Sequence, residues 1–185
     1  ALGLDRPWYE QYASFLAGAV HGDLGKSFIF NMSALELILQ RMPATLELAF
    51  SAMLISILIG IPLGVIAGLN PDNAVGRTIM AGSILGFSLP TFWVGLMLIM
   101  IFAVDLGILP SGRRGDTVDL LGVPVSFLTW DGLKHLILPA INLALFKMAL
   151  VIRLARAGTQ EAMLQDYVKF ARAKGLSHRR VVLVH

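Results

Sequence analysis

The feature that most constrains this chain is a run of 22 residues, from Leu48 to Leu69, without a charged side chain. A second uncharged run of 27 residues extends from Thr78 to Val104. Because about 20 apolar residues in an α-helix cross the hydrocarbon core of a bilayer, either run can span a membrane. A third apolar segment, Leu136 to Ile152, contains one charge and continues into a basic helical pattern. The sequence therefore predicts three spanning helices, over residues 46–69, 78–104 and 136–157.

The composition excludes several other classes of protein. Only 15% of the 185 residues are charged and 56% are hydrophobic, whereas soluble domains have roughly 25% and 45–50%. The lack of cysteine rules out a disulfide scaffold, a thiolate metal site and a cysteine nucleophile. The histidines form no pair four residues apart, so we predict no metal site. No segment alternates as membrane β-strands do, which favours an all-α, polytopic membrane protein.

Lysine and arginine are concentrated near the C-terminal end. Residues 153–185 hold seven of the 15 basic side chains. Because cytoplasmic segments of membrane proteins are enriched in these residues, we expect this tail to be cytoplasmic. Residues 70–77 then also lie inside, whereas 1–47 and 105–135 lie outside. An outer N-terminal segment without a signal peptide predicts a further span before Ala1, so we expect the chain to be a fragment.

Helical structure is also expected outside the membrane. Apolar residues at helical spacing predict an amphipathic helix near the N-terminus; they are Trp8, Tyr12, Phe15, Leu16 and Ala19. A second helical stretch is expected from about Ser33, with Ser33 and Glu36 forming a capping box. Loop 105–135 is rich in glycine and proline and is predicted to be irregular.

Two motif fragments suggest enzyme chemistry, but each lacks a necessary part. Gly25-Lys26-Ser27 matches the end of a phosphate-binding loop, yet Val20 stands where that loop needs its first glycine. Any ATP must therefore be bound by another chain. Ser88 and His135 suggest an intramembrane serine protease, but the bulky Leu89-Pro90 follows the serine in place of an exposed elbow. We interpret Ser88 as part of a helix kink, where its hydroxyl satisfies backbone groups that Pro90 frees.

Two features inside the predicted spans indicate what they pack against. Gly60, Gly64 and Gly68 lie along one face of the first span and predict close packing against another helix. Lys147 is a costly charge within the third span. It either extends to the inner membrane interface or faces a translocation path. We favour the path, because Arg153 and Arg156 already anchor the inner end, and we group Asn142 and Ser88 with it.

The cytoplasmic tail contains a short amphipathic helix. Asp166 is expected to cap a helix from Tyr167 to Lys174, and Gly175 is expected to end it. The residues predicted to share one face are Tyr167, Phe170, Ala171 and Lys174. Eight residues do not hold a helix alone in water, so another surface must receive this face. The residues leave open whether that surface is the lipid headgroup layer or a groove on a partner protein.

Residues 166–176 (DYVKFARAKGL) resemble the conserved cytoplasmic EAA loop of ABC importer permeases. Other segments resemble the first permease subunit of the dipeptide, oligopeptide and nickel branch in the same order along the chain. They are RMPATLEL (41–48), GIPLG (60–64), SLPTFW (88–93), LGILPSG (106–112) and HLILPA (135–140). Where the loop pattern has Glu-Ala-Ala, this chain has Lys169-Phe170-Ala171, so no role for that glutamate carries over.

The resemblance implies an ABC importer type I permease fold with six spans, of which this chain contains about three. Residues 1–40 would be an extracytoplasmic segment after a missing first span, and 41–185 an incomplete permease domain with a coupling loop at 158–180. The implied coupling residues within the 166–177 helix are Asp166, Tyr167, Phe170, Ala171 and Gly175.

The implied function is transport of peptides or a related small solute across a bacterial or archaeal plasma membrane. The implied partners are a sibling permease, two ATPases that bind ATP and Mg²⁺, and an extracytoplasmic solute-binding protein. The chain itself would carry no catalytic residue and no cofactor. The alternative from the residues is a membrane protein without transport activity, such as an intramembrane hydrolase or an assembly scaffold.

Overall fold

The computed structural model describes residues 7–177 and 180–182. The helices in this part of the chain are α1 (Trp8–Val20), α2 (Ala34–Leu69), α3 (Ala74–Ser88), α4 (Thr91–Leu98), the π-helical segment η1 (Ile99–Asp105), α5 (Trp130–Leu164) and α6 (Asp166–Ala173). Strands β1 (Val118–Leu120) and β2 (Val123–Val125) form an antiparallel hairpin between η1 and α5. The predicted all-α fold class is confirmed. Arg179 and the histidines His178 and His185 lie outside the described residues.

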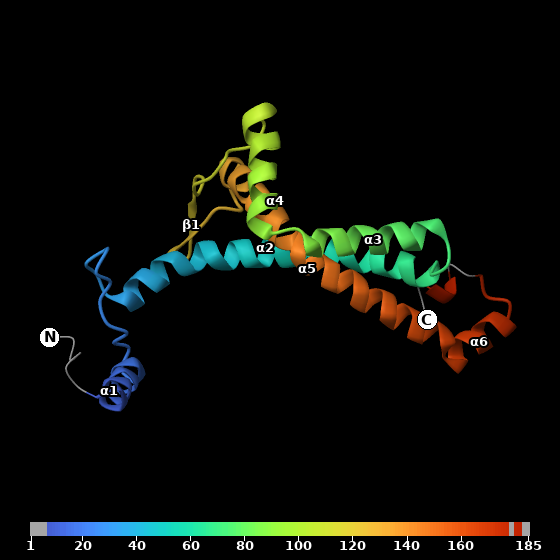
Figure 1. Ribbon diagram of the computed structural model, residues 1–185, viewed down its shortest axis with the longest axis horizontal. Helices are drawn as coiled ribbons and strands as arrows, with labels where there is room; N and C mark the ends of the chain where they lie inside the picture. The colour runs from blue at the N-terminus through green and yellow to red at the C-terminus, as the bar shows by residue number, and fades with distance from the viewer. Residues whose placement is uncertain (1–6, 178–179, 183–185) are drawn as a thin grey trace.

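Helices α2 and α5 form the centre of the molecule and lie along one another (Figure 1). They have 36 and 35 residues, and both are long and apolar enough to cross a membrane. Each is longer than its predicted span. In particular, the helix expected from about Ser33 and the first span are one continuous helix, with Pro43 and Pro62 inside it.

The glycine face of α2 lies directly against α5. A Cβ atom added at Gly64 would come within 2.5 Å of the Ala155 Cβ and 2.7 Å of the Ile152 carbonyl oxygen. Gly60 and Gly68 face Val151 and Thr159 in the same way. Glycine thus permits a backbone approach that no side chain would allow. Because the residue numbers of the contacting positions increase in the same direction along both helices, α2 and α5 run parallel.

The segment predicted as one span over 78–104 is two helices. Helices α3 and α4–η1 are bent by 100° at Leu89-Pro90 (Figure 1). Pro90 has no N–H group and forces Leu89 into an extended conformation (ψ 136°). The Ser88 hydroxyl donates to the Ile84 carbonyl at 2.8 Å. The sequence predicted a kink at this position, and the structure has a full break.

The ends of the helices differ from the sequence expectations at two polar residues. Ser33 occupies the N-cap position of α2, but its side chain makes no capping hydrogen bond, and Glu36 accepts from Gln40 instead. The predicted Ser33–Glu36 capping box is therefore wrong. Helix α1 spans the predicted amphipathic segment, and none of its residues is buried.

Candidate functional site

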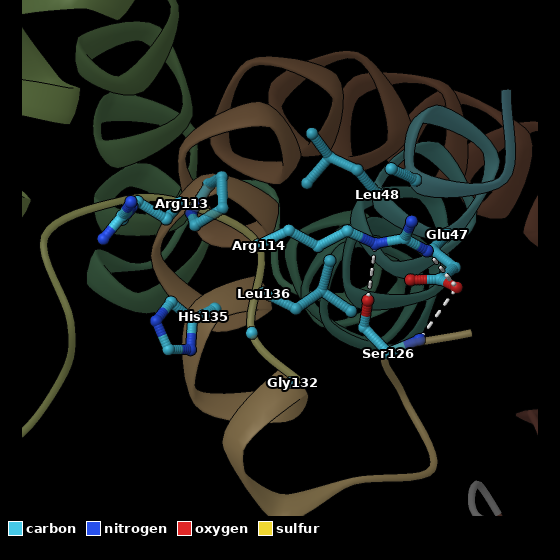
Figure 2. A pocket seen from close by; sticks show the side chains of 11 residues that line it. Glu47, Leu48, Arg113, Arg114, Ser126, Gly132, His135 and Leu136 are labelled. Carbon is cyan, nitrogen blue, oxygen red and sulfur yellow. Dashed lines mark hydrogen bonds and ion pairs between the residues drawn. The ribbon is translucent and has the colours of Figure 1, made fainter. Parts of the chain in front are cut away.

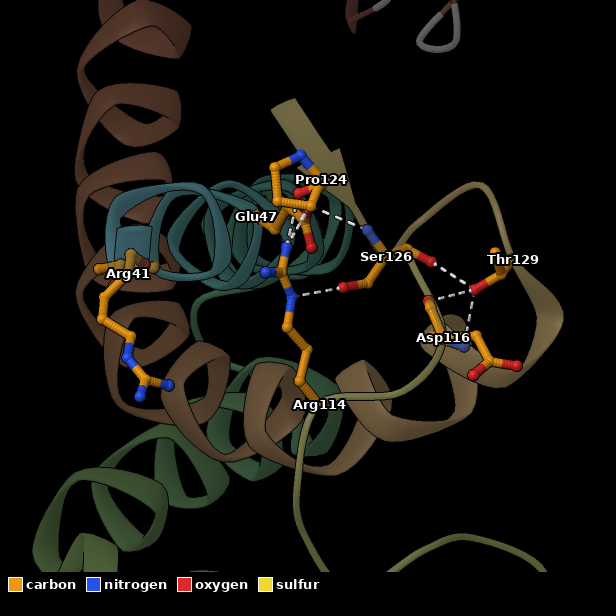
Figure 3. Close-up of polar contacts among 9 residues, drawn as sticks. Arg41, Glu47, Arg114, Asp116, Pro124, Ser126 and Thr129 are labelled. Atoms are coloured by element: carbon orange, nitrogen blue, oxygen red, sulfur yellow. Dashed lines mark hydrogen bonds and ion pairs between the residues drawn. The ribbon is translucent and has the colours of Figure 1, made fainter. Parts of the chain in front are cut away.

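A buried carboxylate holds the loop before α5 onto α2. The Glu47 side chain, 7% exposed, lies 3.2 Å from the Arg114 guanidinium and accepts a hydrogen bond from the Ser126 backbone N–H at 2.9 Å. Arg114 also donates to the Ser126 hydroxyl at 2.9 Å and to the Pro124 carbonyl at 2.7 Å (Figure 3). Each buried side-chain nitrogen and oxygen atom of this cluster therefore has a hydrogen-bond partner. We call these residues, Glu47, Arg114 and Ser126, the loop clamp.

The loop clamp lies at the end of α5 opposite α6. Thr129 caps α5 by accepting from the Gly132 N–H at 2.9 Å, and its hydroxyl donates to the Asp116 carbonyl at 2.7 Å (Figure 3). The Asp131 carboxylate accepts from the Asp116 N–H at 3.0 Å. These bonds fix the loop against both long helices, although the sequence predicted only irregular structure here.

Among the cavities that border the loop held by the clamp, two share lining residues. One of about 150 Å³ lies beside Glu47 and Arg114 (Figure 2). Another, of about 320 Å³, lies between the loop, η1 and α5, and includes Gly95 and Asn142 in its lining. Arg113, His135 and Pro139 line both cavities. The loop therefore presents polar side chains to a hollow between the helices.

The short helix α6 packs one apolar side against the rest of the protein and exposes its aromatic side. Val168 and Ala171 are 3% and 6% exposed and pack with Val181, whereas Tyr167 and Phe170 are 49% and 62% exposed. The face predicted from the sequence is thus divided, because Ala171 points inward. Lys174 lies over the Phe170 ring at 4.5 Å.

The termini of α6 combine one expected feature and one correction. Gly175 has φ +77°, and the N–H groups of Gly175 and Leu176 donate to the carbonyls of Arg172 and Ala171. This is the Schellman arrangement that glycine favours after a helix. Asp166 is inside the helix, and its carboxylate binds Lys169 Nζ at 2.8 Å. Its predicted N-cap role is wrong, since Gln165 occupies that position.

The residues grouped with a translocation path lie apart. Asn142 faces Gly95 of α4, where a Cβ would meet the Asn142 amide nitrogen at 3.1 Å. Lys147 is on an exposed side of α5 together with Leu143, Leu150 and Leu154. Ser88 is bonded to its own helix, and His135 Nδ1 lies 2.9 Å from the Asp131 carbonyl oxygen. Ser88 and His135 thus have partners other than each other, and this arrangement does not favour a serine hydrolase.

Sequence reasoning missed the loop clamp and the neighbouring Arg113. Glu47 and Arg114 are 67 residues apart, and no local periodicity connects them. One signal was available: Glu47 is the last charge before the uncharged run that begins at Leu48. A carboxylate at that depth needs a cationic partner.

Comparison with known proteins places the chain in a family. The family model described as "Binding-protein-dependent transport system inner membrane component" matches residues 60–185. The chain is 37% identical over its whole length to the dipeptide transport system permease protein DppB of Escherichia coli, and 39% identical to the di/tripeptide transport system permease protein DppB of Pseudomonas aeruginosa. It is also 37% identical to the probable D,D-dipeptide transport system permease protein DdpB of E. coli.

The match extends along the whole chain but along only part of each relative. The chain spans 59% of the E. coli DppB protein and 58% of the P. aeruginosa protein. Its apolar parallel helices agree with a membrane component. The chain belongs to the family of binding-protein-dependent transport system inner membrane components.

Proposed function

We propose that the chain is part of a permease subunit of an ATP-driven ABC importer, and that it forms the translocation pathway for peptides or a related small solute. The names of the relatives support peptides as the solute class, since they are dipeptide and di/tripeptide transport permeases. The work of such a subunit is conformational, and it catalyses no covalent step.

The parallel run of α2 and α5 supports a multi-pass topology in a plasma membrane. Two parallel spans require the chain between them to return across the bilayer, which the broken pair α3 and α4–η1 can do. The basic residues after α5 favour a cytoplasmic location for α6. The loop clamp then lies on the outer side. In this arrangement 1–40 is an outer segment and 41–185 belongs to the permease domain.

Helix α6 is the observation that carries the proposal. It is an eight-residue helix, held by Val168 and Ala171, that presents Tyr167 and Phe170 to the outside. Exposed aromatic residues on a short, fixed helix are typical anchors for a groove on a partner protein. We assign that groove to a cytoplasmic ATPase, so that α6 is a coupling helix.

The proposed mechanism links α6 to the opening of the pathway. The partners are two ATPases, a sibling permease and an outer solute-binding protein. ATP and Mg²⁺ bind to the ATPases, and closure of the ATPases moves the coupling helices. ATP shifts the equilibrium between inward-open and outward-open forms because it binds the two with different affinity. We retain Lys147, Asn142 and Ser88 as pathway residues within this proposal.

A pair of substitutions in the full-length protein tests the coupling role. Phe170→Ala should reduce affinity for the ATPases by about thirtyfold, the effect of losing an anchor of about 2 kcal/mol. The permease is co-expressed with its ATPases, and the recovered ATPase is measured after affinity purification. Phe28→Ala is the matched control, because Phe28 is exposed far from α6. Equal ATPase recovery with both variants would contradict the assignment.

A further inference from the structure

Two consecutive arginines of the clamped loop point to different sides. Arg114 is neutralised by Glu47, whereas Arg113 lines both cavities with His135, and Figure 2 shows the smaller of the two. Within the described residues, the Arg113 side chain has no hydrogen bond or ion pair. A positive charge that borders a cavity without a counter-ion is a natural partner for an anion.

A second polar group at the larger cavity also lacks a partner. The Asn142 side-chain oxygen is buried and accepts no hydrogen bond in the part of the chain that the structure describes. A buried acceptor without a donor is costly, so such a group is usually satisfied by a ligand or by water. Gly95 permits α4 to lie close to this amide, since a Cβ there would meet its nitrogen at 3.1 Å. The site therefore offers one acceptor on the α5 wall and a cation on the loop.

His135 adds a ring nitrogen on the same side of the cavity as Arg113. Its Nδ1 atom lies 2.9 Å from the Asp131 carbonyl oxygen and 3.4 Å from the Asp131 carboxylate. Nε2 is therefore the ring nitrogen left for another partner. The cavity of about 320 Å³ is at the lower end of the range for small-molecule sites. Its size suits a solute of a few residues.

We propose that this cavity receives a small zwitterionic solute, with its carboxylate beside Arg113 and His135 and its ammonium against the Asn142 oxygen. The inference rests on the proposed transport function and adds a class of solute group and its contacts. Arginine suits the carboxylate because its planar guanidinium can donate two parallel hydrogen bonds. The separation of donor and acceptor sides would orient the solute.

The first experiment measures the local charge and the protection of the cavity. Ser111, an exposed residue of the lining, is changed to cysteine in an otherwise cysteine-free full-length transporter in proteoliposomes. An anionic methanethiosulfonate reagent should react about tenfold faster than a cationic one, relative to their rates with a free thiol. Arg113→Gln should remove this preference, whereas Lys26→Gln, at an exposed site outside the cavity lining, should keep it. An unchanged preference in Arg113→Gln would overturn the proposal.

The second experiment uses Ala-Ala and two analogues as probes of the Ser111→Cys transporter. Saturating Ala-Ala should slow labelling by about tenfold, and Ala-Ala amide, which lacks the carboxylate, should slow it much less. N-propionyl-alanine, which lacks the ammonium, should protect less than Ala-Ala. The difference in protection between Ala-Ala and N-propionyl-alanine should disappear in Asn142→Leu. Equal protection by all three probes, or by none, would overturn the proposal.

Uptake of radiolabelled Ala-Ala is measured in the same vesicles to separate this inference from the transport function. Protection without ATP-driven uptake would support the site and contradict the function. Uptake without protection would support the function and contradict the site.

Discussion

The Glu47 carboxylate on α2 lies 3.2 Å from the Arg114 guanidinium on the loop before α5. This contact joins segments that precede and follow the broken helix pair α3 and α4–η1. It also holds in place the loop that lines the cavities of about 150 and 320 Å³. The Glu47 side chain is 7% exposed and that of Arg114 is 31% exposed. Glu47 is therefore the partner that loses most when the pair is broken.

Arg114→Met should destabilise the outer end of the molecule by about 3 kcal/mol, at the lower end of the cost of leaving a buried charge unpaired. Glu47→Gln should cost less, because an amide oxygen can still accept from the Ser126 N–H. Thermal unfolding of the purified protein in detergent measures both. Arg113→Met is the control, since Arg113 has no ion pair among the described residues. Equal stability of Arg113→Met and Arg114→Met would contradict the role of the clamp.

Gly64→Ala should destabilise the packing of α2 on α5 by about 1–3 kcal/mol, as overpacking does in protein cores. Its new methyl group would lie 2.5 Å from the Ala155 Cβ and 2.7 Å from a backbone oxygen, which cannot move aside easily. Gly158→Ala is the matched control on α5, where a Cβ has no neighbour within 4 Å. It should be neutral or stabilise the helix by up to about 1 kcal/mol. Melting temperatures in one detergent compare the two, and a Gly64→Ala protein as stable as the parent would refute the prediction.

Gly175→Ala should weaken the end of α6 by about 1–2 kcal/mol, because φ at this position is +77°. Gly175→Asn should have a smaller effect, since asparagine tolerates the left-handed region better than alanine. In the proposed transporter, ATPase recovery should follow the same order: glycine, then asparagine, then alanine. Equal recovery from the alanine and asparagine variants would separate the coupling role from this backbone geometry.

Lys147→Cys should react with a water-soluble thiol reagent in the inward-open form of the full-length transporter and much less in the ATP-trapped form. A residue of the pathway changes its access to water with the state of the transporter. Lys147 shares its exposed side of α5 with leucines, so Leu150→Cys is a stringent neighbour control. Labelling that does not depend on state, or that matches Leu150→Cys, would indicate a side chain that only extends to the membrane interface.

The sequence was sufficient for features that depend on local pattern. The uncharged run 48–69 predicted the helix at α2, and the apolar segment 136–152 predicted the one at α5. The spacing of Gly60, Gly64 and Gly68 indicated a packing face. The position of Gly175 after α6 predicted its left-handed conformation. In each case the determining residues are within a few turns of one another.

Features set by distant contacts could not be predicted in this way. Pro90 located the break, but the angle of 100° also depends on how the helices pack, as where Phe87 stacks on Phe146 with Arg153 over its ring. The pairing of Glu47 with Arg114 crosses 67 residues. The capping roles assigned to Ser33 and Asp166 were wrong. Ser33 makes no capping hydrogen bond, and Glu36 accepts from Gln40. Helix α6 begins one residue earlier than predicted, so Gln165 is its N-cap and Asp166 pairs with Lys169.

The break at Leu89-Pro90 separates α4–η1 from the packed helices α2, α3 and α5. The glycine face of α2 packs closely against α5, and the loop clamp holds the loop before α5 at the end of this helix pair opposite α6. Helix α4 lies on the other side of the break, and its Gly95 lines the cavity directly beside Asn142 of α5. A change in the angle at Leu89-Pro90 would change the volume of this cavity, while the distance between α6 and the loop clamp would stay the same.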